Sequence, residues 1–336
     1  MNEPMGAVED ATLGDPTQER AASSVRVAGI DCGTNSIRLL IADFDQVAGT
    51  MTDRLRRTTL VRLGQDVDRT GRLAPEAIER TRTALADYVA ACRAADVRRI
   101  RMVATSATRD AANREDFRSM VLATLGADPE VVSGDVEAAL SFTGAVRELA
   151  GRVPGPHLVS DLGGGSTELV LGNTGDEPGV VAAYSMDIGS VRLTERHLHD
   201  DPPTAAQVAA AEADIRAAVA QARSVVPVER AATFVGVSGT VTTVSALAQD
   251  LAGYDPDRIH HSRVPLDGVR AVSARMLRST HAERAASPVI QPGRVDVIGA
   301  GALILRVLME EIGAAEVVVS ERDILDGLVW SVLEKG

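Results

Sequence analysis

The same short pattern occurs twice in this chain of 336 residues. Residues 27–41 and 158–171 each read as an apolar strand ending in Asp-x-Gly, a small polar turn that carries a serine, and a second apolar strand. A turn built from Gly, Ser, Thr and Asn leaves backbone N–H groups free and lets a phosphate approach closely. Two copies of this turn predict two similar domains that face each other across a phosphate-binding cleft.

The residues of these turns are the candidate phosphate-binding groups. Aligning the two copies places Asp31 opposite Asp161 and Arg38 opposite Glu168. A third turn follows the apolar run 234–237 and opens a helix, and helix N-termini favour anions. The residues expected to grip phosphate through their backbone N–H groups are Gly33, Thr34, Asn35, Ser36, Gly163, Gly164, Gly165, Ser166, Thr167, Ser238, Gly239 and Thr240.

Composition and charge exclude several function classes. Aromatic residues make up only 2% of the chain, which argues against stacking platforms for single-stranded nucleic acid. The net charge of −12 disfavours nonspecific binding of DNA or RNA. No segment approaches the roughly 18 uncharged apolar residues of a membrane span, and the first residues do not read as a secretory signal. We therefore expect a cytoplasmic protein with neither nucleic acid nor membrane as a partner.

Strands and helices alternate in the same order in both halves of the chain. Each half reads as three opening strands, a helix, a strand and a helix, which is typical of the duplicated actin-like, or ribonuclease-H-like, α/β architecture. We expect a disordered leader over residues 1–24, a first domain over 25–135 and a second domain over 136–336. The closing helix near 324–336 is expected to pack back on the first domain.

Taken together, these motifs resemble the Ppx/GppA family of exopolyphosphatases and guanosine pentaphosphate phosphohydrolases. The likeness runs from about residue 25 to residue 336, and many members carry a further helical C-terminal domain, so we expect a short, two-domain form. The matching stretches are Asp31-x-Gly33-Thr34-Asn35-Ser36, residues 104–111, Ser133-Gly134-x-x-Glu137-Ala138, residues 161–168, Ser238-Gly239-Thr240 and Arg294-x-Asp296.

The resemblance implies a reaction, an ion and a partner. Family members hydrolyse the terminal phosphoanhydride of inorganic polyphosphate, or the terminal phosphate of guanosine pentaphosphate, with Mg²⁺; Mn²⁺ is the alternative ion. A homodimer is also implied. We expect an exopolyphosphatase. The alternatives left open are the pentaphosphate phosphohydrolase, a kinase or ATPase of the same fold, and a sensor that binds polyphosphate or the alarmone without turnover.

Glu137 is the residue that the resemblance implies as general base. It lies in the first turn of a helix that follows Ser133, where a carboxylate could hold a water in line with a terminal phosphorus. From the sequence alone, the same carboxylate could merely favour the positive end of the helix dipole. Family members often have two adjacent carboxylates here, whereas this chain has Val136 before Glu137, with Asp135 close by.

Three carboxylates and two arginines complete the predicted site. Asp161 and Glu168 offer hard oxygen ligands for Mg²⁺, and Asp31 is the matching carboxylate of the other half. An exposed strand position for Glu168, and a structural turn role for Asp31, are the alternatives. Arg38 and Arg109 are candidate phosphate clamps, because a guanidinium bonds two oxygens at once. Structural ion pairs or helix caps are expected for Arg294, Asp296, Arg322 and Asp323.

Overall fold

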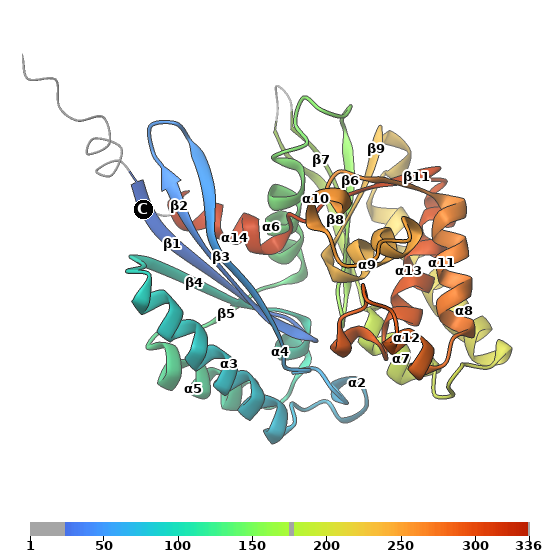
Figure 1. The fold of residues 1–336 in the computed structure, drawn as a ribbon, viewed down its shortest axis with the longest axis horizontal. Helices are drawn as coiled ribbons and strands as arrows, with labels where there is room; N and C mark the ends of the chain where they lie inside the picture. The colour runs from blue at the N-terminus through green and yellow to red at the C-terminus, as the bar shows by residue number, and fades with distance from the viewer. Residues whose placement is uncertain (1–23, 175–177, 335–336) are drawn as a thin grey trace, which may run out of the picture.

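A computed structural model describes residues 24–174 and 178–334, so the leader expected over residues 1–24 lies, except for Ser24, outside the described residues. Two β-sheets stand side by side, each with helices on both of its faces (Figure 1). Among the described residues, no helix is long and apolar enough to cross a bilayer.

The first sheet has the strand order β3-β2-β1-β4-β5. The strands β1, β2 and β3 form an antiparallel meander, and β4 and β5 add to it in parallel. Their bounds are β1 (Ser24–Cys32), β2 (Ser36–Asp45), β3 (Thr50–Leu60), β4 (Arg99–Ala104) and β5 (Glu130–Val131). The apolar side chains of α3 (Pro75–Ala94) and α5 (Arg114–Leu125) cover the outer face, and the short helices α2 (Val67–Thr70) and α4 (Ser106–Asp110) lie in the connections.

The second sheet has the order β10-β11-β9-β6-β7-β8. Its strands are β6 (His157–Leu162), β7 (Thr167–Asn173), β8 (Gly179–Met186), β9 (Thr233–Val237), β10 (Arg263–Pro265) and β11 (Glu316–Val319). The largest core of the protein lies under its outer helices. The helices of this half are α7 (Ser190–His197), α8 (Ala205–Val225), α9 (Ser238–Ala248), α10 (Pro256–Ile259), α11 (Leu266–Arg278), α12 (His281–Ala285) and α13 (Ile298–Ile312).

The strand order confirms the predicted duplication. The run β8-β7-β6-β9-β11 repeats β3-β2-β1-β4-β5, so both halves share one α/β topology of the actin-like type. The register agrees at the level of single residues: Asp31 faces Arg38 across the β1–β2 hairpin, and Asp161 faces Glu168 across the β6–β7 hairpin.

Two helices fill the space between the sheets. The apolar side of α6 (Gly134–Val146) packs on the second sheet, and α14 (Ile324–Glu334) packs on β1, β2 and β4 of the first sheet. The two helices cross each other at glycines: a Cβ on Gly144 would overlap the carbonyl oxygen of Asp323, and a Cβ on Gly327 would overlap that of Leu140. Backbone therefore lies directly on backbone at the crossing, and this contact fixes how close the two halves come.

The crossing can be tested with a matched pair of glycines. Gly327→Ala should destabilise the protein by about 1–3 kcal/mol, because the added methyl group forces two packed helices apart. Gly268→Ala in α11 is the control, since a Cβ there meets nothing nearer than 3.5 Å and alanine is the better helix former. Urea unfolding of both variants measures the difference. Equal effects at the two positions would argue against a close crossing.

Candidate active site

A cleft of about 760 Å³ lies between the two halves, where both polar turns meet. The elements that line it come from opposite ends of the chain, from β1 to the start of α14. Three predicted site residues, Arg109, Gly165 and Thr167, adjoin the lining without belonging to it. The predicted residues that line the cleft are Asp31, Gly33, Thr34, Asn35, Ser36, Arg38, Glu137, Asp161, Gly163, Gly164, Ser166, Glu168, Ser238, Gly239 and Thr240.

The two polar turns have the same geometry. The N–H of Gly33 donates to the carbonyl of Ser36 at 2.9 Å, and the N–H of Gly163 donates to the carbonyl of Ser166 at 3.0 Å. A Cβ on Gly163 would lie 2.9 Å from the Ser166 oxygen, so the tight turn requires glycine. Within the described residues, the N–H groups between these bonds have no protein acceptor. They are available for the oxygens of a phosphate.

The N-terminus of α9 supplies a third anion-binding feature. Ser238 has a φ of 79°, a left-handed conformation that is uncommon for serine and typical of strained functional turns. Gly239 lets the guanidinium of Arg294 lie directly over the first turn, where any side chain would overlap it. The Arg294 guanidinium has no acceptor among the described residues, and burial lowers its pKa. A half-buried guanidinium with no hydrogen-bond acceptor among the described residues, at a helix N-terminus, favours a bound anion.

Sequence reasoning missed this role of Arg294. From the sequence, a structural ion pair or helix cap is expected for Arg294. The structure instead has a 3-10 turn, η2 (Pro292–Arg294), and α13 begins only at Ile298. The sequence signal for a functional Arg294 is its place in the Arg294-x-Asp296 stretch that matches the family. In the structure Asp296 pairs with Arg62 at 2.7 Å, whereas no ion pair is found for Arg294 among the described residues.

Glu137 is buried in the first turn of α6, a helix capped by the hydroxyl of Ser133. The Nη1 of Arg109 donates to its Oε2 at 3.0 Å and also to the carbonyl of Val132. Burial, together with the charge of Glu168, raises the pKa of Glu137 well above the usual value, although Arg109 opposes the shift. A carboxylate with a raised pKa can take up a proton near neutral pH.

Asp161 and Glu168 stand beside each other on β6 and β7, as their alignment predicts. The Ser141 hydroxyl donates to Asp161 at 2.5 Å, and the Ser185 hydroxyl donates to Glu168 at 2.7 Å. Burial and the charges of Asp323 and Glu168 raise the pKa of Asp161 to about 7. Burial likewise raises the pKa of Glu168, which is only 1% exposed. Glu168 is therefore not the solvent-facing residue that a strand pattern alone allows.

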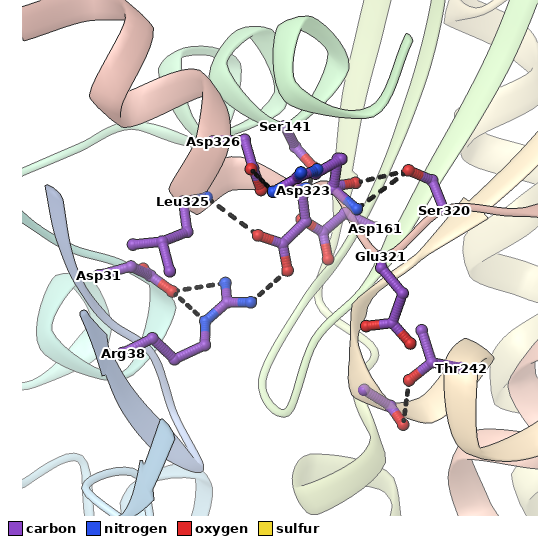
Figure 2. A network of polar contacts seen from close by, with 12 residues as sticks. Asp31, Arg38, Ser141, Asp161, Thr242, Ser320, Glu321, Asp323, Leu325 and Asp326 are labelled. Carbon is purple, nitrogen blue, oxygen red and sulfur yellow. Dashed lines mark hydrogen bonds and ion pairs between the residues drawn. The ribbon is translucent and has the colours of Figure 1, made fainter. Parts of the chain in front are cut away.

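Arg38 lies between two carboxylates from opposite ends of the chain (Figure 2). Its Nε and Nη2 donate to one oxygen of Asp31 at 2.9 and 2.6 Å, and its Nη1 donates to Asp323. The other oxygen of Asp31 is buried without a hydrogen-bond partner among the described residues. An unpaired buried carboxylate oxygen is costly, so this position fits a cation or a water.

Asp323 belongs to this network rather than to the second half alone. One of its oxygens accepts the N–H of Leu325 at 3.0 Å at the start of α14, and the other accepts from Arg38. Although burial opposes it, Arg38 and Arg56 hold the pKa of Asp323 below its usual value. Its neighbour Arg322 also reaches the first half, pairing with Asp53 at 2.7 Å. The ion pairs expected for these residues exist, but they join the two halves.

Negative charge is in excess in this part of the cleft. Arg38 pairs with Asp31 and Asp323, and Arg109 pairs with Glu137. Two further buried carboxylates, Asp161 and Glu168, have no ion-pair partner among the described residues. Burying unbalanced carboxylates is costly unless protons or a cation offset them. Mg²⁺ commonly uses one or two carboxylates together with waters and phosphate oxygens, so the Asp161–Glu168 pair fits this ion.

The described residues contain one cluster of three potential ligand atoms within 4.8 Å of one another, and it lies elsewhere: Glu148, His260 and His261. The ligand atoms of the predicted triplet, Asp31, Asp161 and Glu168, do not all lie within 4.8 Å of one another. His260 is engaged on both sides, accepting the N–H of Glu321 at Nδ1 and contacting Glu148 through Nε2. These bonds give His260 a structural role.

A duplicated actin-like fold whose two polar turns face buried carboxylates is typical of a class of phosphoryl-transfer and phosphate-hydrolysing proteins. Comparison with known proteins narrows this class. The model of the Ppx/GppA phosphatase family matches residues 40–336, and the chain belongs to this family of hydrolases. The resemblance found in the sequence motifs is thereby confirmed.

Individual relatives cover nearly the whole chain. It is 52% identical over 318 residues to Exopolyphosphatase 2 of Mycobacterium tuberculosis, a match that spans 91% of this chain and 98% of that protein. The solved structure of an exopolyphosphatase-like protein has a TM-score of 0.88 at 44% identity and covers 93% of this chain and 99% of that one. The PPX-GPPA enzyme of Aquifex aeolicus has a TM-score of 0.76 at 30% identity, with 92% and 99% covered.

The raised pKa of Glu137 predicts a pH-dependent stability. The folded protein holds this proton more tightly than the unfolded chain, so its stability is full below the ordinary glutamate pKa and falls as the pH rises toward the folded-state value. In EDTA, Glu137→Gln should match the wild type at pH 4 and exceed it by about 1 kcal/mol or more at pH 8. Thermal unfolding at both pH values measures this.

The control for this experiment is Glu79→Gln, which removes an exposed carboxylate paired with Arg82 on the surface of α3. No pH-dependent gain is expected there, because burial is absent. A Glu137→Gln variant that is less stable than the wild type at pH 8 would contradict a raised pKa of Glu137 in the folded protein.

Proposed function

We propose that this chain is an exopolyphosphatase, which hydrolyses the terminal phosphoanhydride of inorganic polyphosphate and releases orthophosphate. The observation that carries the proposal is the meeting of two phosphate turns, a helix N-terminus and the buried Glu137 in one cleft. Membership of the Ppx/GppA family and 52% identity to an exopolyphosphatase support it.

In the proposed mechanism, Glu137 orients a water molecule and accepts its proton as the oxygen attacks the terminal phosphorus in line. The new P–O bond forms as the bridging P–O bond breaks, giving orthophosphate and a chain one unit shorter. Glu137 then returns the proton to solvent or product. Its raised pKa suits this exchange near neutral pH. Arg109 positions the Glu137 carboxylate through the 3.0 Å contact.

The protein carries a net charge of −12, which repels a polyanionic substrate. Positive groups in the cleft are therefore needed to bind the reacting phosphate. The residues of both turns and of the α9 N-terminus line the cleft. Preorganised amide donors of this kind stabilise charge that develops in the transition state. Asp161 and Glu168, with Asp31 opposite, would hold Mg²⁺, which when bound neutralises phosphate oxygens. Arg38 is the candidate clamp of the first half, held in place by Asp31 and Asp323.

The second half offers polar contacts rather than a stacking surface for a base. Around the α9 N-terminus the lining consists of Ser238, Gly239, Thr240, Arg294, Val297 and Ile298, and none of the described residues that line the cleft is aromatic. Successive phosphates of a polyphosphate chain match these groups. This favours polyphosphate over guanosine pentaphosphate as the substrate.

The proposal is tested by orthophosphate release with Mg²⁺ from long polyphosphate, short polyphosphate, guanosine pentaphosphate and ATP in parallel. Polyphosphate is expected to be hydrolysed fastest. Faster release from the pentaphosphate would move the assignment to the alarmone, and binding without release from any substrate would make the protein a sensor.

Glu137→Gln should lower the rate of orthophosphate release by about 10²–10⁴, because it removes the general base. The matched control is Asp135→Asn, which makes the same change in the same turn of α6 on an exposed side chain. We expect the control to stay within about threefold of the wild type. A comparable loss in both variants would contradict the assignment of the base to Glu137.

Arg294→Gln should raise the KM for polyphosphate by about tenfold or more, since a charge-assisted hydrogen bond to phosphate is lost. The control is Arg278→Gln, which removes an arginine charge from the end of α11, away from the cleft lining. Steady-state kinetics at two salt concentrations measure the effect. An unchanged KM would show that Arg294 does not contact the chain.

A further inference from the structure

One end of the cleft is closed by a contact between the two halves. Thr34, which is 7% exposed, lines the cleft and also lines a separate, much smaller crevice. Thr34 is therefore the partition between these two spaces. It meets Ser106 of α4 and the second polar turn at Gly164 and Gly165. We call Thr34, Ser106, Gly164 and Gly165 the end wall.

The end wall leaves no room for a further group. The hydroxyls of Thr34 and Ser106 share a hydrogen bond of 2.9 Å. A Cβ on Gly165 would lie 2.5 Å from the Thr34 hydroxyl and 2.6 Å from the Ser106 hydroxyl, and a Cβ on Gly164 would lie 3.1 Å from the Cβ of Thr34. Two hydroxyl-bearing side chains of the first half thus press directly on the glycine backbone of the second. A phosphate unit cannot pass between them.

Ion pairs behind the end wall hold it closed. Arg192, on α7 of the second half, pairs with Asp68 of α2 at 3.2 Å and with Asp110 of α4. Its backbone N–H also donates to the carbonyl of Gly164 at 3.1 Å, which ties the ion pairs to the wall itself. Arg196 adds a second contact to Asp68 at 3.1 Å. Parting the end wall therefore requires breaking several contacts between the halves.

We propose that the end wall restricts this enzyme to the ends of its substrate, so that Thr34 and Ser106 are specificity-determining residues. The inference rests on the proposed exopolyphosphatase function. A terminal phosphorus continues into the chain on one side only, whereas an internal phosphorus continues on both. When a phosphorus reaches Glu137, the chain can leave through the open side of the cleft, and the end wall blocks a second chain segment.

The experiment compares two substrates: long polyphosphate with free ends, and the same polyphosphate with both terminal phosphates blocked as alkyl esters. The wild type should release orthophosphate from the first and leave the second intact. Water attack on an internal phosphorus would convert one blocked chain into two shorter chains, each with one new free end. Gel electrophoresis of the chains detects this product, and a phosphate assay follows the terminal reaction.

Two variants open the wall in different ways. Thr34→Gly combined with Ser106→Ala removes the side chains of the wall and keeps the backbone amides, whereas Arg192→Ala removes the brace behind it. Both should cut blocked chains about tenfold or more above the wild-type background. Arg82→Ala, which removes an exposed pair with Glu79 far from the wall, is the control and should leave blocked chains intact.

The proposal is overturned if the wild type cuts blocked chains as readily as it shortens free-ended ones. It is also overturned if every variant that still releases orthophosphate leaves blocked chains intact. If the double variant does not fold, the Arg192→Ala variant still tests the proposal, because Arg192 does not line the cleft. Failure of the wild type to release orthophosphate from free-ended chains would instead refute the proposed function.

Discussion

The crossing of α6 and α14 at Gly144 and Gly327 is the contact on which the rest of the structure depends. One helix covers the inner face of each sheet, so the distance between the helices is the distance between the halves. Glycine at both points brings backbone onto backbone. The same crossing places Glu137, at the start of α6, and Asp323, just before α14, beside residues of the first half. The helix crossing therefore determines both the distance between the halves and the positions of Glu137 and Asp323.

The cleft combines an acidic centre with cationic edges. Buried carboxylates crowd around Asp161, while the polar turns, the α9 N-terminus and Arg294 supply positive potential where phosphates would lie. Holding unbalanced carboxylates out of water weakens the fold in the absence of a ligand. Functional sites commonly carry such a cost, because the same groups become favourable once a cation and a polyanion are bound.

Much of the fold could be predicted because the duplicated Asp-x-Gly pattern involves residues that are close together in the sequence. Each copy of the Asp-x-Gly pattern lies within about one hairpin, so the duplication, the turns and the cross-strand pairs could be read directly. The partners of Arg38 could not, since Asp323 lies 285 positions away and only the crossing of α14 brings it near. The position of Arg294 over the first turn of α9 could not be predicted either, because it depends on the 3-10 turn before α13 and on a contact with the distant Gly239. The metal and phosphate roles of the site residues stay predictions.

The end wall has a consequence for the order of events in the cleft. With one end of the cleft closed as proposed, the incoming chain and the departing orthophosphate would share its open side. Orthophosphate formed beside Thr34 would then lie between the wall and the shortened chain. The next phosphate unit could then reach Glu137 only after orthophosphate has left past the chain, or after the chain has dissociated. In the proposed arrangement, product release and chain movement, as well as bond cleavage, would contribute to the turnover rate.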